Sequence, residues 1–171
     1  QNIIAKIINN ELDDDLWYGI YVDDAKVGWI NWKSFLKKDV FVEILEFISI
    51  TKFEGQIETI SNKYVAEFDS KPPYFILKYS GTTTNENQYF SLIEGNRKND
   101  DFVVEFEEGK SKRIKTLKNL DYSLYDLLAM SIWLFNVPQI GDKINSREYI
   151  FDELRYMNMQ SEIFDYKESK I

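Results

Sequence analysis

The 171-residue chain contains neither cysteine nor histidine. Without cysteine it can form no disulfide, no thiolate nucleophile and no cysteine-based metal site. Without histidine it lacks the most common general base and the imidazole of the Ser-His-Asp and Cys-His catalytic groups. These absences predict a non-enzymatic chain with no catalytic residue, no metal ion and no cofactor.

Long apolar runs and a net positive charge are also missing. The longest apolar candidate, LLAMSIWLF at residues 127–135, is far shorter than the roughly 18 residues that a membrane-spanning helix needs. The formal net charge is −8, which repels nucleic acid and anionic lipid head groups at long range. We therefore expect no transmembrane segment and no nucleic-acid partner.

Aromatic residues, by contrast, are abundant, at 16% of the chain, within a hydrophobic share of 44%. A chain of this length and composition can bury a core as one domain, and the excess of Tyr and Phe favours strands. We expect an N-terminal arm at residues 1–15, which ends in the acidic cluster Asp13–Asp15, and a single domain at residues 16–171. The chain does not begin with Met and ends in an apparent strand, so we expect a fragment of a longer protein.

From residue 16 to about residue 116, apolar and polar residues alternate with period two between short polar turns, which predicts an antiparallel meander. Phe102, Val104 and Phe106, for example, share one face of their strand. Pro72 and Pro73 interrupt the pattern, because proline cannot donate to a ladder. The expected strands, including two later ones, are Leu16–Val22, Val27–Lys33, Val40–Phe53, Gln56–Phe68, Tyr74–Tyr79, Gln88–Glu94, Phe102–Glu107, Lys110–Thr116, Ile144–Phe151 and Tyr156–Tyr166.

The segment SLYDLLAMSIWLFNVP changes the period and predicts one helix at Leu124–Phe135. Ser123 and Asp126 have the spacing of a capping box, and Asn136 is followed by a proline stop. Only Asp126 and Ser131 are clearly polar within the helix, so nearly its whole circumference requires burial. We predict a mainly β (α+β) fold in which a strongly curved antiparallel sheet, a half-barrel, wraps around one long buried helix.

The first candidate site is the aromatic hairpin WYGIYVDDAKVGWINW at residues 17–32. Trp17 and Tyr21 share one face of their strand, whereas Trp29 and Trp32 lie on opposite faces of the next. Stacked rings can hold sugars or apolar chains, but cross-strand aromatic pairs also stabilise hairpins, and we favour a core role. A ligand between sheet and helix would also meet the apolar helix. The ligand-binding candidates are therefore Trp17, Tyr21, Trp29, Trp32, Trp133 and Phe135.

A basic run, GKSKRIKTLK at residues 109–118, is the second candidate, as a phosphate or nucleic-acid patch. A hairpin turn at its glycine places the run beside EFEE. Glu105 and Glu107 then lie opposite Lys112 and Lys110 and neutralise much of the charge. We favour this structural interpretation.

Four strand acids, Glu43, Glu46, Glu58 and Glu67, are the third candidate. Glycoside hydrolysis requires one buried acid and one ionised partner at a defined separation, and inward-facing members of this set would supply them. Glutamates lie far more often on the solvent face of a strand, so we favour the structural interpretation. No phosphate loop or dinucleotide fingerprint is present.

Four segments in order, WYGIYV…KVGWI, KPPYFILKYS, DYSLYDLLAMSIWL and VPQIGDKI, resemble the non-catalytic N-terminal domain of bacterial transglutaminase-like, papain-type extracytoplasmic proteins. The resemblance covers most of the chain from Trp17 onward, although Asp24-Ala25 stands where that family has a glycine in the first turn. Such proteins carry their Cys, His and Asp in a following domain. The resemblance therefore implies no catalytic residue here, a periplasmic or secreted location, and a role in positioning or scaffolding that domain.

The predicted curved sheet is also similar to the half-barrel of bacterial lipoprotein carriers, an analogy of fold alone. Three functions stay open. The first is a non-enzymatic accessory domain whose partner is another domain of the same polypeptide or a separate protein. The second is a carrier or binder of lipid or another apolar ligand, and the third is a glycan-binding module. An apolar cavity of a few hundred Å³ between sheet and helix would favour the carrier.

Overall fold

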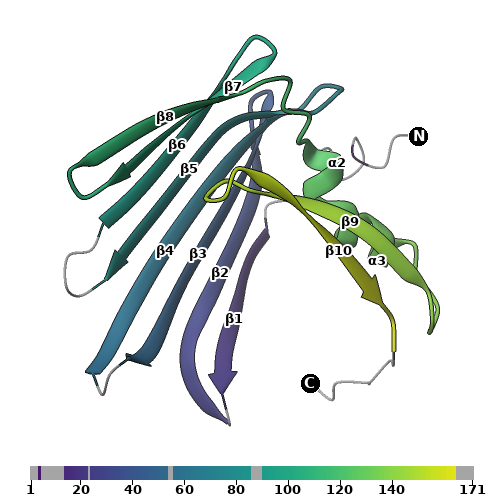
Figure 1. Cartoon of the computed structure of the whole chain (residues 1–171). Coiled ribbons are helices and arrows are strands. Elements are labelled where there is room, and N and C mark those ends of the chain that lie inside the picture. The colour runs from purple at the N-terminus through teal and green to yellow at the C-terminus, as the bar shows by residue number, and fades with distance from the viewer. Residues whose placement is uncertain (1–3, 5–13, 23, 54–55, 86–89, 165–171) are drawn as a thin grey trace.

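The computed structural model describes residues 4, 14–22, 24–53, 56–85 and 90–164, most of which form strands (Figure 1). The elements, in chain order, are β1 (Asp14–Val22), β2 (Ala25–Lys37), β3 (Val40–Phe53), β4 (Gln56–Asp69), β5 (Ile76–Asn85), β6 (Phe90–Lys98), β7 (Asp101–Glu108), β8 (Ser111–Leu117), α2 (Leu124–Leu127), α3 (Ala129–Phe135), β9 (Lys143–Ile150) and β10 (Arg155–Glu162).

The first eight strands form one antiparallel sheet in which every strand pairs with its neighbour in sequence, so β1 and β8 are its edges. The predicted meander is thus confirmed, and a strand is present at each of the ten predicted places. The predicted break at Pro72 and Pro73 lies between β4 and β5. At the first turn, Asp24 has a φ of 64°, the left-handed conformation for which glycine is the usual residue.

Alternation along the strands gives the sheet two chemically distinct faces. Phe102, Val104 and Phe106 on β7 are buried, whereas Glu105 between them is exposed. Directly paired residues share a face in an antiparallel sheet, and Phe41 on β3 pairs with Phe68 on β4. We call the face that carries these buried side chains the covered face, and the other the opposite face.

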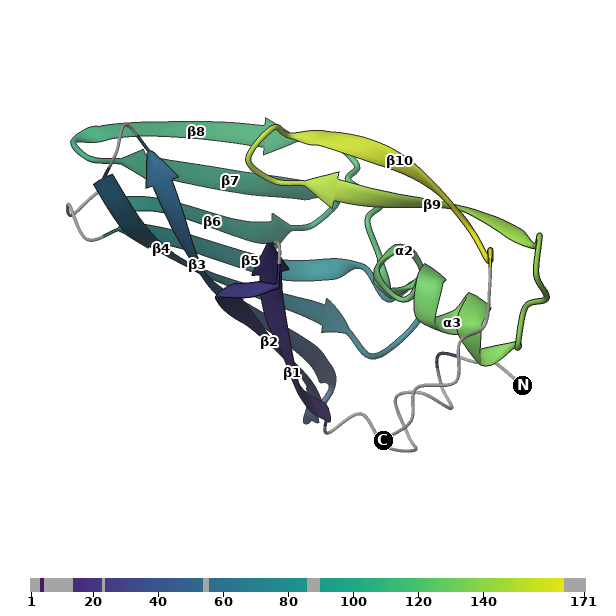
Figure 2. The same cartoon turned by 90° about the horizontal axis from the view of Figure 1, so that it is seen from below.

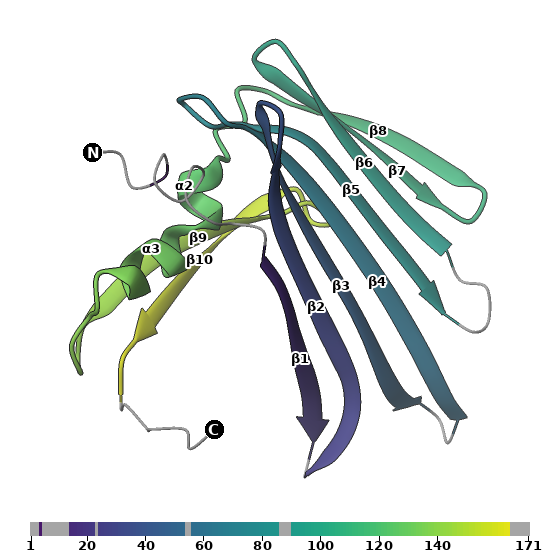
Figure 3. The same cartoon turned by 180° about the vertical axis from the view of Figure 1, so that it is seen from behind.

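A second layer of structure lies against the covered face. Figures 2 and 3 show the β9–β10 hairpin, α2 and α3 on one side of the sheet, and the sheet bends around that side. The buried core joins the two layers, since Tyr149 and Phe151 of the hairpin segment belong to the same cluster as Phe68 and Phe102. Phe102 also packs over Gly95, where a Cβ would lie 2.2 Å from its ring.

The prediction of one long buried helix is wrong. The helical segment is broken at Leu128 (φ −91°, ψ 5°), which separates α2 from α3. Tyr125 is 48% exposed, so the circumference is not buried as predicted. Both helices pack against β9. The hairpin and the two helices therefore cover the sheet together, in place of a single helix. Neither described helix has the length and apolar character that crossing a membrane would require.

Candidate functional site

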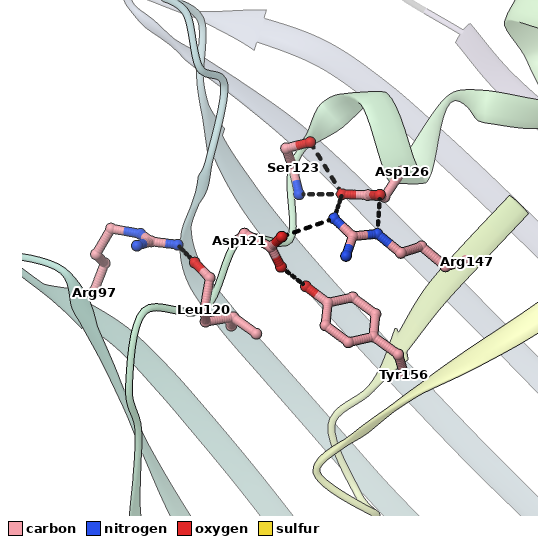
Figure 4. A network of polar contacts seen from close by, with 7 residues as sticks. All are labelled: Arg97, Leu120, Asp121, Ser123, Asp126, Arg147 and Tyr156. Carbon is pink, nitrogen blue, oxygen red and sulfur yellow. Dashed lines mark hydrogen bonds and ion pairs between the residues drawn. The ribbon is translucent and has the colours of Figure 1, made fainter.

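An ionic network fixes the hairpin to the segment that leads into α2 (Figure 4). Arg147 on β9 donates from Nε to Asp126 Oδ1 at 2.6 Å and from Nη2 to Asp121 at 3.2 Å. The Tyr156 hydroxyl on β10 also donates to Asp121, and the Arg147 guanidinium lies 4.4 Å from the centre of the Tyr156 ring. These contacts raise the pKa of Arg147 above its ordinary value, chiefly through the Asp126 hydrogen bond, so its charge is fully engaged.

The same segment is tied to the sheet. Asp126 accepts hydrogen bonds from the backbone N–H and the hydroxyl of Ser123, at 2.9 and 3.0 Å, which confirms the predicted capping box. Arg97 on β6 donates to the carbonyls of Ile76 and Leu120, both at 2.7 Å. The segment therefore holds hairpin and sheet at a fixed separation.

Two adjoining cavities lie between the covered face and this second layer. The first cavity, of about 220 Å³, and the second cavity, of about 260 Å³, share five lining residues: Glu43, Leu45, Tyr122, Leu127 and Glu148. Tyr64, Tyr79, Tyr149 and Phe151 complete the aromatic lining of the first cavity. The second cavity extends along Trp32, Met130 and Met159.

Glu43 lies at the junction of the two cavities, on β3. Burial raises the pKa of its carboxyl to about 7, and the negative charge of Glu148 adds to the rise. The nearby indole of Trp32 offsets part of this rise in pKa, although Trp32 Nε1 forms no hydrogen bond within normal geometric limits. Among the described residues, no lysine or arginine forms an ion pair with Glu43.

Four tyrosines line the first cavity together with Glu43. Tyr79 stacks on Phe151 with 3.9 Å between ring centres, and Tyr64 lies 6.3 Å from Tyr79. Burial raises the pKa of Tyr64, Tyr79 and Tyr122, so these hydroxyls stay protonated at neutral pH. Burial also raises the pKa of Asp152, which lines the first cavity.

The sequence-predicted aromatic candidates do not form one site. Trp17 and Tyr21 are 60% and 61% exposed, so the core interpretation is wrong for both. Trp17 lies 5.0 Å from Trp29 between ring centres, whereas Trp32 lines the second cavity. Trp133 is half-buried but lines neither cavity, and the Phe135 side chain lies outside the described part of the chain.

Of the four candidate acids, only Glu43 lines either cavity. Glu46 is paired with Lys63 at 2.6 Å, and Glu67 with Lys78 at 3.7 Å. Glu58 is half-buried elsewhere on β4. The glycosidase pair that these four acids would supply is therefore not assembled.

The basic run forms cross-strand pairs, with a different register from the predicted one. Glu107 lies opposite Lys112, with 2.8 Å between their charged atoms, while Glu105 lies opposite Ile114. The pairing of Lys112 supports the structural interpretation of this run.

Most of the residues that line the first cavity with Glu43 are not among the sequence-predicted candidates, namely Tyr64, Tyr79, Tyr122, Glu148, Tyr149, Phe151 and Asp152. One signal was available, since Glu43 is in phase with Phe41 and Leu45 and thus on the face of a buried phenylalanine. For the hairpin residues the sequence offers no such signal, because their position in the cavity depends on how the hairpin packs against the sheet.

Comparison of the chain with protein-family models, with curated proteins and with solved structures finds no match. In the part of the chain that the structure describes, no three acidic side chains converge in a way that could hold a metal ion.

Proposed function

We propose that the chain is a binding domain for a small ligand with an apolar body, held between the covered face and the hairpin. The observation that carries the proposal is the pair of adjoining cavities, about 220 and 260 Å³, that open between the covered face and the hairpin. Sites for small ligands are typically concave and lined mostly by apolar and aromatic side chains, with a few polar groups among them. The lining of these two cavities has that composition.

The size and lining of the cavities suit such a ligand. An apolar cavity of about 150 Å³ accommodates benzene, and ligand pockets begin at roughly 300 Å³. Each cavity exceeds the first value, and the two adjoin at Leu45 and Leu127. Aromatic and aliphatic side chains would contact the body of the ligand. The curved sheet, a half-barrel, would bend around it.

A neutral fluorescent probe, N-phenyl-naphthylamine, tests the proposal in the folded chain. Ala66 lines the first cavity, so Ala66→Phe fills it, whereas Val65→Phe places the same ring on the opposite face of β4. We expect the wild type and Val65→Phe to bind the probe, and Ala66→Phe to bind it about tenfold more weakly, a loss of about 1.4 kcal/mol.

Leu127→Trp, from the helix side, provides a second cavity-filling variant in case Ala66→Phe does not fold, and circular dichroism checks the fold of each variant. Absence of probe binding by the wild type, or equal binding by wild type and a folded cavity-filling variant, would overturn the proposal.

The accessory role beside a transglutaminase-like domain and the periplasmic or secreted location stay predictions. Neither conflicts with ligand binding. The exposed side chains of β1, among them Trp17 and Tyr21, offer a surface for another domain or protein. Trp32 faces the second cavity, so no glycan platform is formed by Trp17, Tyr21, Trp29 and Trp32 together.

A further inference from the structure

We infer that the ligand is an organic cation, with an ammonium group bound by Glu43 in the first cavity and an apolar body in the second. The inference rests on the proposed function and adds the chemical class of the ligand. Three carboxyl side chains (Glu43, Glu148 and Asp152), four tyrosines and Phe151 line the first cavity, and no lysine or arginine does. This one-sided lining is the observation that carries the inference.

Aromatic rings and carboxylates attract the same kind of ligand. The face of a tyrosine ring is electron-rich and attracts an ammonium group within about 6 Å of its centre. A buried carboxylate is costly unless a positive charge or hydrogen-bond donors compensate it. Glu43 is buried, lines the first cavity together with Tyr64, Tyr79 and Tyr122, and forms no ion pair with a described lysine or arginine. A ligand ammonium group supplies the missing charge.

A metal ion fits this site less well than an organic cation. Calcium and magnesium require about six or more oxygen ligands at short range, and the acids of the described residues form no such cluster. An organic cation needs only one close carboxylate and an aromatic wall. The first cavity supplies both.

The second cavity fixes the orientation of the ligand. Leu45, Leu127, Met130 and Met159 line it with apolar surface. Arg147 lines it too, but its guanidinium is held by Asp126 and Asp121. Met130 and Met159 line only the second cavity and Asp152 lines only the first, so the cationic end lies in the first cavity and the apolar body extends toward the methionines.

Cation binding is coupled to the ionisation of Glu43. Trp32 on β2 lines the second cavity with Glu43. The titratable groups that line the two cavities with Glu43 are Tyr64, Tyr79, Tyr122, Asp126, Arg147, Glu148, Tyr149 and Asp152. Without ligand, burial holds the pKa of Glu43 at about 7, so the carboxyl is about half protonated at neutral pH. An adjacent ammonium group favours the carboxylate, and binding therefore releases a proton. Affinity is highest above pH 7 and falls as the pH is lowered.

Calorimetry with benzyltrimethylammonium, the neutral near-isostere dimethyl benzyl carbinol and the anion benzenesulfonate tests the inference on the full chain. At pH 8 we expect the cation to bind at least about tenfold more tightly than either analogue. Between pH 8 and pH 6, the Kd of the cation should rise about tenfold, with proton release detected as a buffer-dependent heat. The neutral analogue should show no such dependence.

Two glutamate variants on β3 distinguish cation binding at Glu43 from attraction of the cation by negative charge elsewhere on the surface. Glu43→Gln removes the ionisable group without changing its size, and we expect about tenfold weaker cation binding at pH 8 and no pH dependence. Glu46→Gln, three residues on and paired with Lys63 on the opposite face, should behave as the wild type. Thermal unfolding confirms that both variants are folded.

The outcomes distinguish the two proposals. If the fluorescent probe binds in the cavities but the cation binds no better than its neutral analogue, the inference fails and the binding function stands. Retention of cation affinity and its pH dependence by Glu43→Gln would also overturn the inference. If neither probe nor cation binds the wild type, both proposals fail.

Discussion

Glutamates on the two faces of the large sheet have different neighbours. On the opposite face, Glu46, Glu67 and Glu107 each have a lysine directly across on the neighbouring strand and form an ion pair with it. On the covered face, Glu43 lies across from Ser34 on one side and Ala66 on the other, beneath the hairpin. Glu43 is thus buried without a cross-strand lysine, whereas the glutamates of the opposite face are either paired with lysine or, like Glu94 and Glu105, exposed to solvent.

Truncation of an aromatic ring on the covered face should give the largest loss in the free energy of unfolding, and the same kind of change on the opposite face a small one. Phe102 is fully buried and packs over Gly95 and against Phe151. Phe102→Ala should reduce the free energy of unfolding by about 3–5 kcal/mol, because a large cavity forms in the core. Val103→Ala, on the half-buried opposite face of the same strand, should cost less than about 1 kcal/mol. Urea unfolding measures both, and equal losses would contradict the two-face description.

Glu43 should make stability depend on pH in an unusual direction. The carboxyl titrates near 4.5 when unfolded and at about 7 when folded, so the native state holds more protons in between. Its contribution to stability is therefore lost as the pH rises through this window. Relative to Glu43→Gln, the wild type should lose about 2–3 kcal/mol between pH 5 and pH 8.

Urea unfolding at the two pH values checks this prediction, with Glu46→Gln as the control. That variant should keep the wild-type difference between pH 5 and pH 8. If Glu43→Gln also keeps it, Glu43 is not the group responsible.

The anchor of the hairpin should give a smaller effect. The Asp126 side chain is only 10% exposed, and Arg147→Met leaves its carboxylate without its cation. We expect a loss of about 1–2 kcal/mol in the free energy of unfolding. Lys112→Met removes an ion pair at the exposed β7–β8 hairpin and should produce no measurable change. Thermal unfolding compares the two, and equal shifts would show that the network does not anchor the hairpin.

Local patterns were sufficient to predict the strands and the helix start. Alternation defines β7 residue by residue, and the Ser123–Asp126 capping box is set by residues three apart. The helix prediction failed beyond its first turn, since apolar composition does not show whether burial comes from a wrapped sheet or from a neighbouring hairpin. Phe151 meets Tyr79 only through packing between distant parts of the chain, so no local pattern predicts the hairpin side of the site.

The sequential pairing of β1 to β8 has a consequence for how the molecule assembles. Each strand needs only the one before it, so the sheet can grow hairpin by hairpin with small loops to close at every step. The cavities, by contrast, require β3 to β5 to meet residues that come much later in the chain. We therefore expect the hairpin to dock last during folding. In native hydrogen exchange, β9 and β10 should open while the central strands stay protected, which gives a ligand a route inward.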